Sequence, residues 1–189
     1  RKKMVVKETK NGGIIVVGSR TQKTTSQVEE LKKLKDLVFI EFNSDLVLNE
    51  EAFQKEIENT LKMEEELITS GKTVVVYTKR KLLVIENDTK EEALLRSVKI
   101  SDAVQSLVGK LQVIPAFVIA KGGITSSDVG TKALKVKRAN VLGQIWPGIP
   151  VWQTGEESKF PMIPYIIFPG NVGEASTLKE AVEILLNNE

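Results

Sequence analysis

The stretch Ala116–Asp128, AFVIAKGGITSSD, decides how this chain is expected to fold. Its first five residues form a short, continuous apolar run, which is typical of a buried strand. The glycine pair Gly122-Gly123 follows almost at once, and Thr125–Asp128 offers several residues that commonly cap helix N-termini. The stretch therefore predicts a strand, a glycine turn and a helix in direct succession.

Similar apolar runs recur along the chain and alternate with longer segments of helical periodicity. The other expected strands are Ile14–Val17, Leu37–Phe42, Val74–Tyr77, Asn140–Gly143 and Tyr165–Phe168, with a short extended piece at Leu82–Ile85. Continuous apolar strands that alternate with amphipathic helices indicate an α/β fold with a mainly parallel sheet and helices on both faces. We expect residues 1–189 to form a single domain.

Four further helices are expected to begin at residues of the types that commonly cap helix N-termini. Ser26 and Thr177 each precede a glutamate by three residues, the spacing of a capping box. Asn49 precedes two glutamates, and a further cap is expected near Asp88 or Thr89. The helix after Thr89 is expected to bury an apolar face made of Leu94, Val98, Val104, Leu107, Val108 and Leu111.

The segment Trp146–Pro164 has no clear period and contains four of the six prolines and both tryptophans. It predicts an ordered loop or a hairpin packed on the body of the domain. Trp146 and Trp152 can serve as packing residues or, alternatively, as a wall against an adenine ring.

Composition excludes several classes of function. The chain has 27 Lys and Arg against 25 Asp and Glu, and it lacks both Cys and His, which excludes disulfides, thiol catalysis and Ser-His-Asp hydrolysis. The net charge of +2 without a long basic run argues against a nucleic-acid partner, and Lys79-Arg80-Lys81 is expected to be a solvated turn. The apolar runs are too short to span a bilayer, so we expect a cytoplasmic protein with no membrane partner. No metal-ligating set of side chains is predicted.

Three strand-to-helix junctions carry the candidate site. They are Gly18-Ser19, Gly122–Ser126 and Gly170–Gly173. Because parallel strands end at the same edge of a sheet, these glycine-rich loops are expected to share one rim, where unpaired helix N–H groups favour an anion. Glycines in turns and hydroxyls at caps also occur without any ligand. None of the junctions is a Walker A loop or a G-x-G-x-x-G fingerprint.

The order of these junctions resembles one family, the four-carbon acid sugar kinases, in their C-terminal nucleotide-binding domain. This family was formerly a domain of unknown function and has also carried the label type III effector, Hrp-dependent. The resemblance rests on four pieces in order: Val16–Ser19 with Gln27, Gly122–Ser126, Pro147–Pro150 and Pro169–Gly173. Two positions depart from the family pattern: Ile124 stands where the family has an acidic residue, and Phe168-Pro169 where it has a lysine.

The resemblance implies ATP as the ligand, with Mg²⁺ bridging phosphate oxygens. The residues expected to contact the nucleotide are Ser19, Gly122, Gly123, Thr125, Ser126, Gly170, Asn171 and Gly173. It also implies a kinase acting on threonate, erythronate or 3-oxo-tetronate, whose substrate and catalytic carboxylate belong to a separate N-terminal domain. The chain opens with Arg rather than Met, so we expect the C-terminal half of a longer enzyme, inactive by itself, and no catalytic residue is assigned here.

Two other functions stay open on the sequence alone. The departures at Ile124 and Phe168-Pro169 suit a non-catalytic or regulatory domain that binds an anionic metabolite. A structural domain with an empty rim is the third interpretation, in which the Trp-bearing stretch is a partner surface. The sequence names neither the sugar acid nor the oligomeric state, although a homodimer is compatible with the family.

Overall fold

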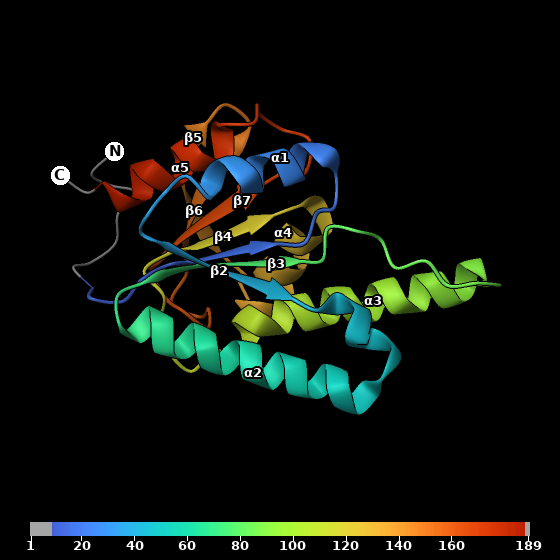
Figure 1. Ribbon diagram of the computed structural model, residues 1–189. Helices are drawn as coiled ribbons and strands as arrows, with labels where there is room; N and C mark the ends of the chain where they lie inside the picture. Colours follow the sequence, from blue (N-terminus) through green and yellow to red (C-terminus); the bar gives the residue numbers. More distant parts are fainter. Residues whose placement is uncertain (1–8, 188–189) are drawn as a thin grey trace.

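The computed structural model describes residues 9–187 and contains a seven-stranded sheet (Figure 1). The strand order is β2-β3-β1-β4-β7-β6-β5. The first five strands in this order are parallel, and β6 and β5 are added antiparallel at one edge. The strands are β1 (Ile14–Val17), β2 (Leu37–Phe42), β3 (Thr73–Thr78), β4 (Val118–Lys121), β5 (Ala139–Trp146), β6 (Ile149–Thr154) and β7 (Pro164–Phe168).

Helices cover both faces of the sheet, as the sequence predicts (Figure 1). On one face lie α1 (Gln22–Leu31) and α5 (Thr177–Leu186), and on the other lie α2 (Glu50–Thr69), α3 (Lys90–Gly109) and α4 (Gly123–Asp128). A 3₁₀ helix, η1 (Ser44–Leu48), precedes α2, and a π-helical turn, η2 (Val129–Ala133), continues α4. The mainly parallel α/β fold is therefore confirmed.

The apolar runs are continuous because both faces of the central strands are covered. In β1 all four side chains are fully buried. Ile14 and Val16 join the core beneath α2 and α3, whereas Ile15 and Val17 join the core beneath α1 and α5. Successive side chains of a strand point to opposite faces, so a strand between two helical layers has to be apolar at every position.

Helix starts follow the capping rules, with three corrections. The first is α4, which begins at Gly123 with Gly122 at the cap position, so the expected caps Thr125–Asp128 lie inside the helix. Asn49 accepts a hydrogen bond from the Ala52 amide at 3.0 Å, and Thr89 forms a capping box with Glu92. Helix α1 begins four residues before the predicted Ser26 cap, because Thr21 already caps it by accepting the Thr24 amide at 3.2 Å. At α5 the cap position is Ser176, and Thr177 is the first helical residue.

Three other expectations meet different outcomes. Trp146–Pro164 supplies the turn and the second strand of a hairpin, in which β6 pairs with β5 across the turn at Pro147-Gly148; β5 itself lies before the segment except for Trp146. Leu82–Ile85 forms no strand. The predicted apolar face of α3 is buried only in its C-terminal half, from Ala103 onward, since Leu94 and Val98 are exposed. The first turns of α3 extend beyond the carboxyl edge of the sheet (Figure 1), where no other element covers them.

Candidate functional site: a glycine rim beside an apolar pocket

The three glycine junctions meet at the carboxyl edge of the parallel strands. Gly18 lies against Thr125, and a Cβ added at Gly18 would stand 2.0 Å from the Thr125 hydroxyl oxygen. Gly122 has a φ of 122° and lies against Ser19, with 3.2 Å from an added Cβ to the Ser19 Cβ. The first two junctions therefore interlock, and glycine is required at both positions by close approach or by backbone conformation.

Backbone hydrogen bonds fix the same edge. The Gly18 amide donates to the Lys121 carbonyl at 3.2 Å, and the Gly122 amide donates to the Phe168 carbonyl at 2.9 Å. These bonds link β1, β4 and β7 in the order in which the strands lie side by side. We call this edge, formed by residues 18–21, 122–125 and 169–173, the rim.

Two glycines of the rim face open space instead. Apart from its chain neighbours and its own helix backbone, a Cβ added at Gly123 would meet no atom of the described residues within 4 Å. One added at Gly170 would meet only the Ser19 hydroxyl among them, at 3.7 Å. Packing therefore does not explain why these positions lack a side chain. The close approach of a ligand to the backbone would explain it. Gly173 differs from them, because its φ is 82° and it packs closely on Thr177.

The predicted hydroxyl groups hold the loops together. Ser126 is buried, and its hydroxyl lies 2.9 Å from the Ala120 carbonyl and 2.6 Å from the Gly122 carbonyl. Ser19 Oγ accepts a hydrogen bond from the Thr24 hydroxyl at 2.9 Å. Direct contact of Ser19, Thr125 or Ser126 with a ligand stays a prediction.

Cations that sequence reasoning did not assign to the site bind carbonyls of the rim. Arg80 donates to the Ser19 carbonyl at 2.7 Å, Lys23 to the Asn171 carbonyl at 3.3 Å, and Lys121 to the carbonyls of both Pro169 and Gly170. The expectation of a solvated turn at Lys79–Lys81 is wrong for Arg80, which is partly buried and also binds Thr78. Its position two residues after the end of β3 was the signal available in the sequence.

None of these three cations forms an ion pair with a carboxylate within residues 9–187. Lys121 is fully buried, and burial, with a smaller contribution from Lys23, lowers the pKa of its ammonium to about 8. Burial also lowers the pKa of Arg80, together with the charge of Arg20. The rim thus carries cations that form no ion pair with a carboxylate of the described residues, which suits an anionic ligand.

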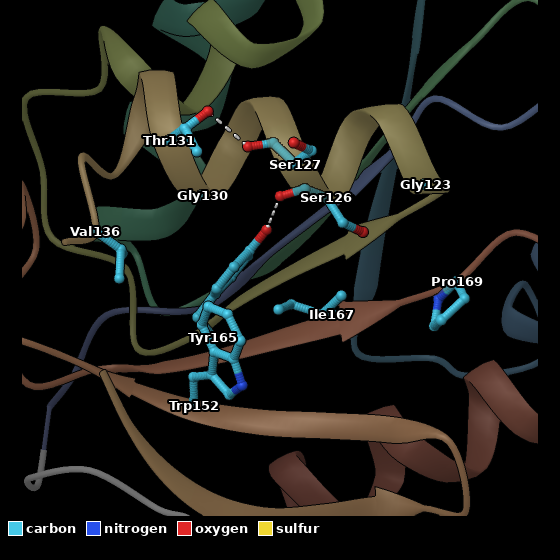
Figure 2. Close-up of a pocket in the computed structure, with 10 residues that line it drawn as sticks. All are labelled: Gly123, Ser126, Ser127, Gly130, Thr131, Val136, Trp152, Tyr165, Ile167 and Pro169. Atoms are coloured by element: carbon cyan, nitrogen blue, oxygen red, sulfur yellow. Dashed lines mark hydrogen bonds between the residues drawn. The ribbon is translucent and has the colours of Figure 1, made fainter. Parts of the chain in front are cut away.

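An apolar pocket of about 320 Å³ adjoins the rim (Figure 2). Gly123 and Pro169 line it at the rim, and Trp152, Tyr165 and Ile167 form its floor beneath α4 and η2. Trp152 packs edge-on against Tyr165, whose hydroxyl donates to the Ser126 carbonyl. Burial raises the pKa of the Tyr165 phenol, so this hydroxyl stays protonated as a fixed donor. The volume lies at the lower end of the range for small-molecule sites.

The part of the chain that the structure describes shows no group of three or more acidic residues that could hold a metal ion. Asp128, the carboxylate in the short helix next to the rim, lies 3.8 Å from Lys132. In this same part no helix has the length and apolar character needed to cross a membrane.

An open α/β sheet with glycine loops at the carboxyl edge of its parallel strands is the arrangement of α/β proteins that bind nucleotides and related anions. The sequence matches the family described as the nucleotide-binding C-terminal domain over residues 14–178. The chain therefore belongs to this family of nucleotide-binding domains, which confirms the resemblance at the level of the domain. No curated protein matches the chain significantly.

Solved structures share the fold. A Bordetella bronchiseptica protein of the DUF1537 group, a domain-swapped dimer with bound citrate, matches with a TM-score of 0.70 and 16% identity over 93% of this chain. A DUF1537 protein from Haemophilus influenzae matches with a TM-score of 0.66 and 22% identity over 96% of this chain. A protein from Salmonella typhimurium LT2, provisionally described as a tRNA synthase, matches with a TM-score of 0.66 and 17% identity over 97%. The match spans only 41–42% of these longer chains.

Proposed function

We propose that this chain is the ATP-binding half of a kinase that phosphorylates a hydroxyl of a small, four-carbon sugar acid such as threonate, erythronate or 3-oxo-tetronate. The observation that carries the proposal is the rim: open glycines lie together with cations that form no ion pair in the described residues, in a domain of the nucleotide-binding family. Phosphoryl transfer needs positioning and charge stabilisation more than a reactive protein side chain, so a chain without His or Cys can still serve it.

The two parts of the site suit the two parts of a nucleotide. The rim suits the phosphates, because Gly123 and Gly170 leave their backbone accessible and the cations provide positive charge. The pocket suits the base, since its walls are mainly apolar and include the aromatic rings of Trp152 and Tyr165. Gly123 lines the pocket and belongs to the rim, so one ligand could occupy both parts.

The described residues bring backbone amides and cations to the rim but no cluster of carboxylates. This donor set fits phosphate oxygens, and it leaves Mg²⁺ to be held mainly by the phosphates and water. When bound, the metal supplies neutralisation of phosphate charge. The residues of this chain orient the phosphates and shelter the base.

The sugar acid and the group that accepts its hydroxyl proton are assigned to a partner domain. The longer length of the matching structures motivates this assignment. Citrate, bound by the Bordetella protein, is itself a hydroxy acid, and that protein is a dimer, so we extend the proposal to a hydroxy-acid substrate and a homodimer. The chain alone is then expected to bind nucleotide and to transfer no phosphate.

The test is calorimetric titration of the chain with ADP and ATP, with and without Mg²⁺, beside the variant Gly123→Val. Because the space around Gly123 is open, the variant should keep the unfolding temperature of the parent chain while losing nucleotide. Equal nucleotide affinity of the parent chain and the variant would show that the nucleotide does not bind at the rim. Turnover of any sugar acid by this chain alone would contradict the assignment of the substrate site to a partner domain.

A second function is favoured by one observation. Ile124, beside the open glycine, is 69% exposed and puts an apolar side chain where the resembling family has an acid. A domain that binds an anionic metabolite without chemistry needs no acid there. Tighter binding of a sugar phosphate or a carboxylate than of ADP in the same titrations would support this function over the first.

A further inference from the structure

Lys121 is a fully buried cation whose hydrogen-bond acceptors in the described residues are backbone carbonyls. It is the last residue of β4, and its ammonium lies 2.7 Å from the Pro169 carbonyl oxygen and 3.1 Å from that of Gly170. The ammonium also lies 4.3 Å from the centre of the Phe168 ring, and Phe168 is the residue of β7 paired with Lys121. A buried charge is costly unless it is well bonded, so this arrangement calls for a reason beyond packing.

The two carbonyl bonds fix the direction of two amides. In a trans peptide the carbonyl and the N–H of the next residue point in opposite directions, and no cis peptide bond occurs between residues 9 and 187. Carbonyls of Pro169 and Gly170 that point to Lys121 therefore turn the N–H groups of Gly170 and Asn171 away from it. Neither amide has a partner elsewhere in the described chain.

The loop that carries these amides is open to its surroundings. Gly170 has only the Ser19 hydroxyl near the place of its missing Cβ, and the Asn171 residue is exposed. Two successive free amides beside a positive charge make a concave site for an anion, and phosphate oxygens are acceptors that such a site binds well.

We propose that Lys121 is a positioning residue, whose ammonium holds the Pro169 and Gly170 carbonyls inward so that the Gly170 and Asn171 amides bind a phosphate. The inference rests on the proposed function for the identity of the ligand, a nucleoside diphosphate or triphosphate. Lys121 itself does not touch the ligand; it acts through the loop.

The experiment compares ADP with adenosine in the parent chain, in Lys121→Met and in Lys55→Met. Lys55 is an exposed lysine of α2 that pairs with Glu51, so Lys55→Met makes the same change of charge away from the rim. We expect Lys121→Met to weaken the binding of ADP by roughly tenfold or more, which is the effect of losing a pair of charge-assisted hydrogen bonds. Adenosine should keep its affinity, and Lys55→Met should leave both ligands unchanged. A general loosening of the fold would weaken both ligands alike.

A second measurement on the parent chain keeps the inference testable if Lys121→Met does not fold. Inorganic pyrophosphate is titrated while the backbone amide resonances are followed by NMR, and those of Gly170 and Asn171 should shift most strongly. Shifts that leave these two amides unchanged, or no shifts at all, would overturn the inference.

The outcomes separate the two proposals. If pyrophosphate shifts the Gly170 and Asn171 amides but ADP does not bind better than pyrophosphate, the nucleotide function fails and the anion site stands. If ADP binds and Lys121→Met keeps the full preference for ADP over adenosine, the nucleotide function stands and the role of Lys121 fails.

Discussion

Gly122 and Gly123 are neighbours in the sequence, yet the structure gives them opposite surroundings. Gly122, like Gly18, is enclosed: its φ is 122°, and the Ser19 amide and side chain lie close to the place of its missing Cβ. Gly123, like Gly170, faces empty space. The fold explains why glycine is needed at the enclosed positions but not at the open ones. The open glycines are therefore the ones that point to a ligand.

The largest expected loss of stability comes from substituting an enclosed glycine, Gly18. Gly18→Ala places a Cβ 2.0 Å from the Thr125 hydroxyl oxygen, so the loops must separate. Overpacking of this kind costs about 3 kcal/mol of unfolding free energy, which urea unfolding measures. Adding Thr125→Ala should recover part of the loss, because it removes the clashing oxygen. Full additivity of the two losses would show that the contact does not matter.

Replacing each of the adjacent glycines by alanine gives the next effect. Gly122→Ala forces a side chain into a backbone conformation suited to glycine and should cost about 2 kcal/mol. Gly123→Ala, at the first position of α4, should change stability by less than about 1 kcal/mol in either direction. Thermal unfolding of the two variants measures both changes in stability. Equal losses of stability would show that enclosed and open glycines do not differ in their importance for the fold.

The smallest expected effect concerns a second comparison, between the two buried ionisable residues Lys121 and Glu64. Glu64 on α2 is fully buried like Lys121, but neither of its carboxylate oxygens has a partner in the described residues. Burial raises the pKa of Glu64 well above its ordinary 4.5. Between the two pKa values the folded chain holds a proton that the unfolded chain has lost, so stability should fall as pH rises above about 4.5.

Glu64→Gln should therefore stabilise the chain by roughly 1 kcal/mol at neutral pH, because a neutral amide does not have to take up a proton when the chain folds, as the ionised carboxylate of the unfolded chain does. It should also flatten the decline of stability between acidic and neutral pH. Urea unfolding at several pH values measures both effects. An unchanged pH profile would show that Glu64 is ionised or solvated in the folded chain.

The sequence predicts the framework of this molecule well for physical reasons. A strand covered on both faces has to be apolar at every position, so runs such as Ile14–Val17 are visible without the structure. The meeting of the glycine junctions also follows from the sequence, because parallel strands end at one edge. The exposed half of α3 was missed, since its apolar residues have the same helical spacing whether or not another element covers them.

The cations of the site lie beyond such reasoning. Lys121 ends an apolar strand and resembles a surface residue in the sequence, but it turns inward to carbonyls contributed by a loop near the far end of the chain. Arg80 reaches the Ser19 carbonyl from a different strand end. These contacts depend on strand order, which places β1 and β7 on either side of β4, and periodicity alone does not reveal that order.

The interlocked rim has a consequence for how the chain folds. Its parts come from residues near 18, 122 and 170, and they meet only after β1, β4 and β7 have paired across long stretches of intervening chain. Contacts of such long sequence separation are slow to form, because the entropy of closing large loops is lost first. A partly folded chain lacks the rim altogether, so a ligand held there draws its binding energy from complete folding and stabilises the whole domain rather than one loop.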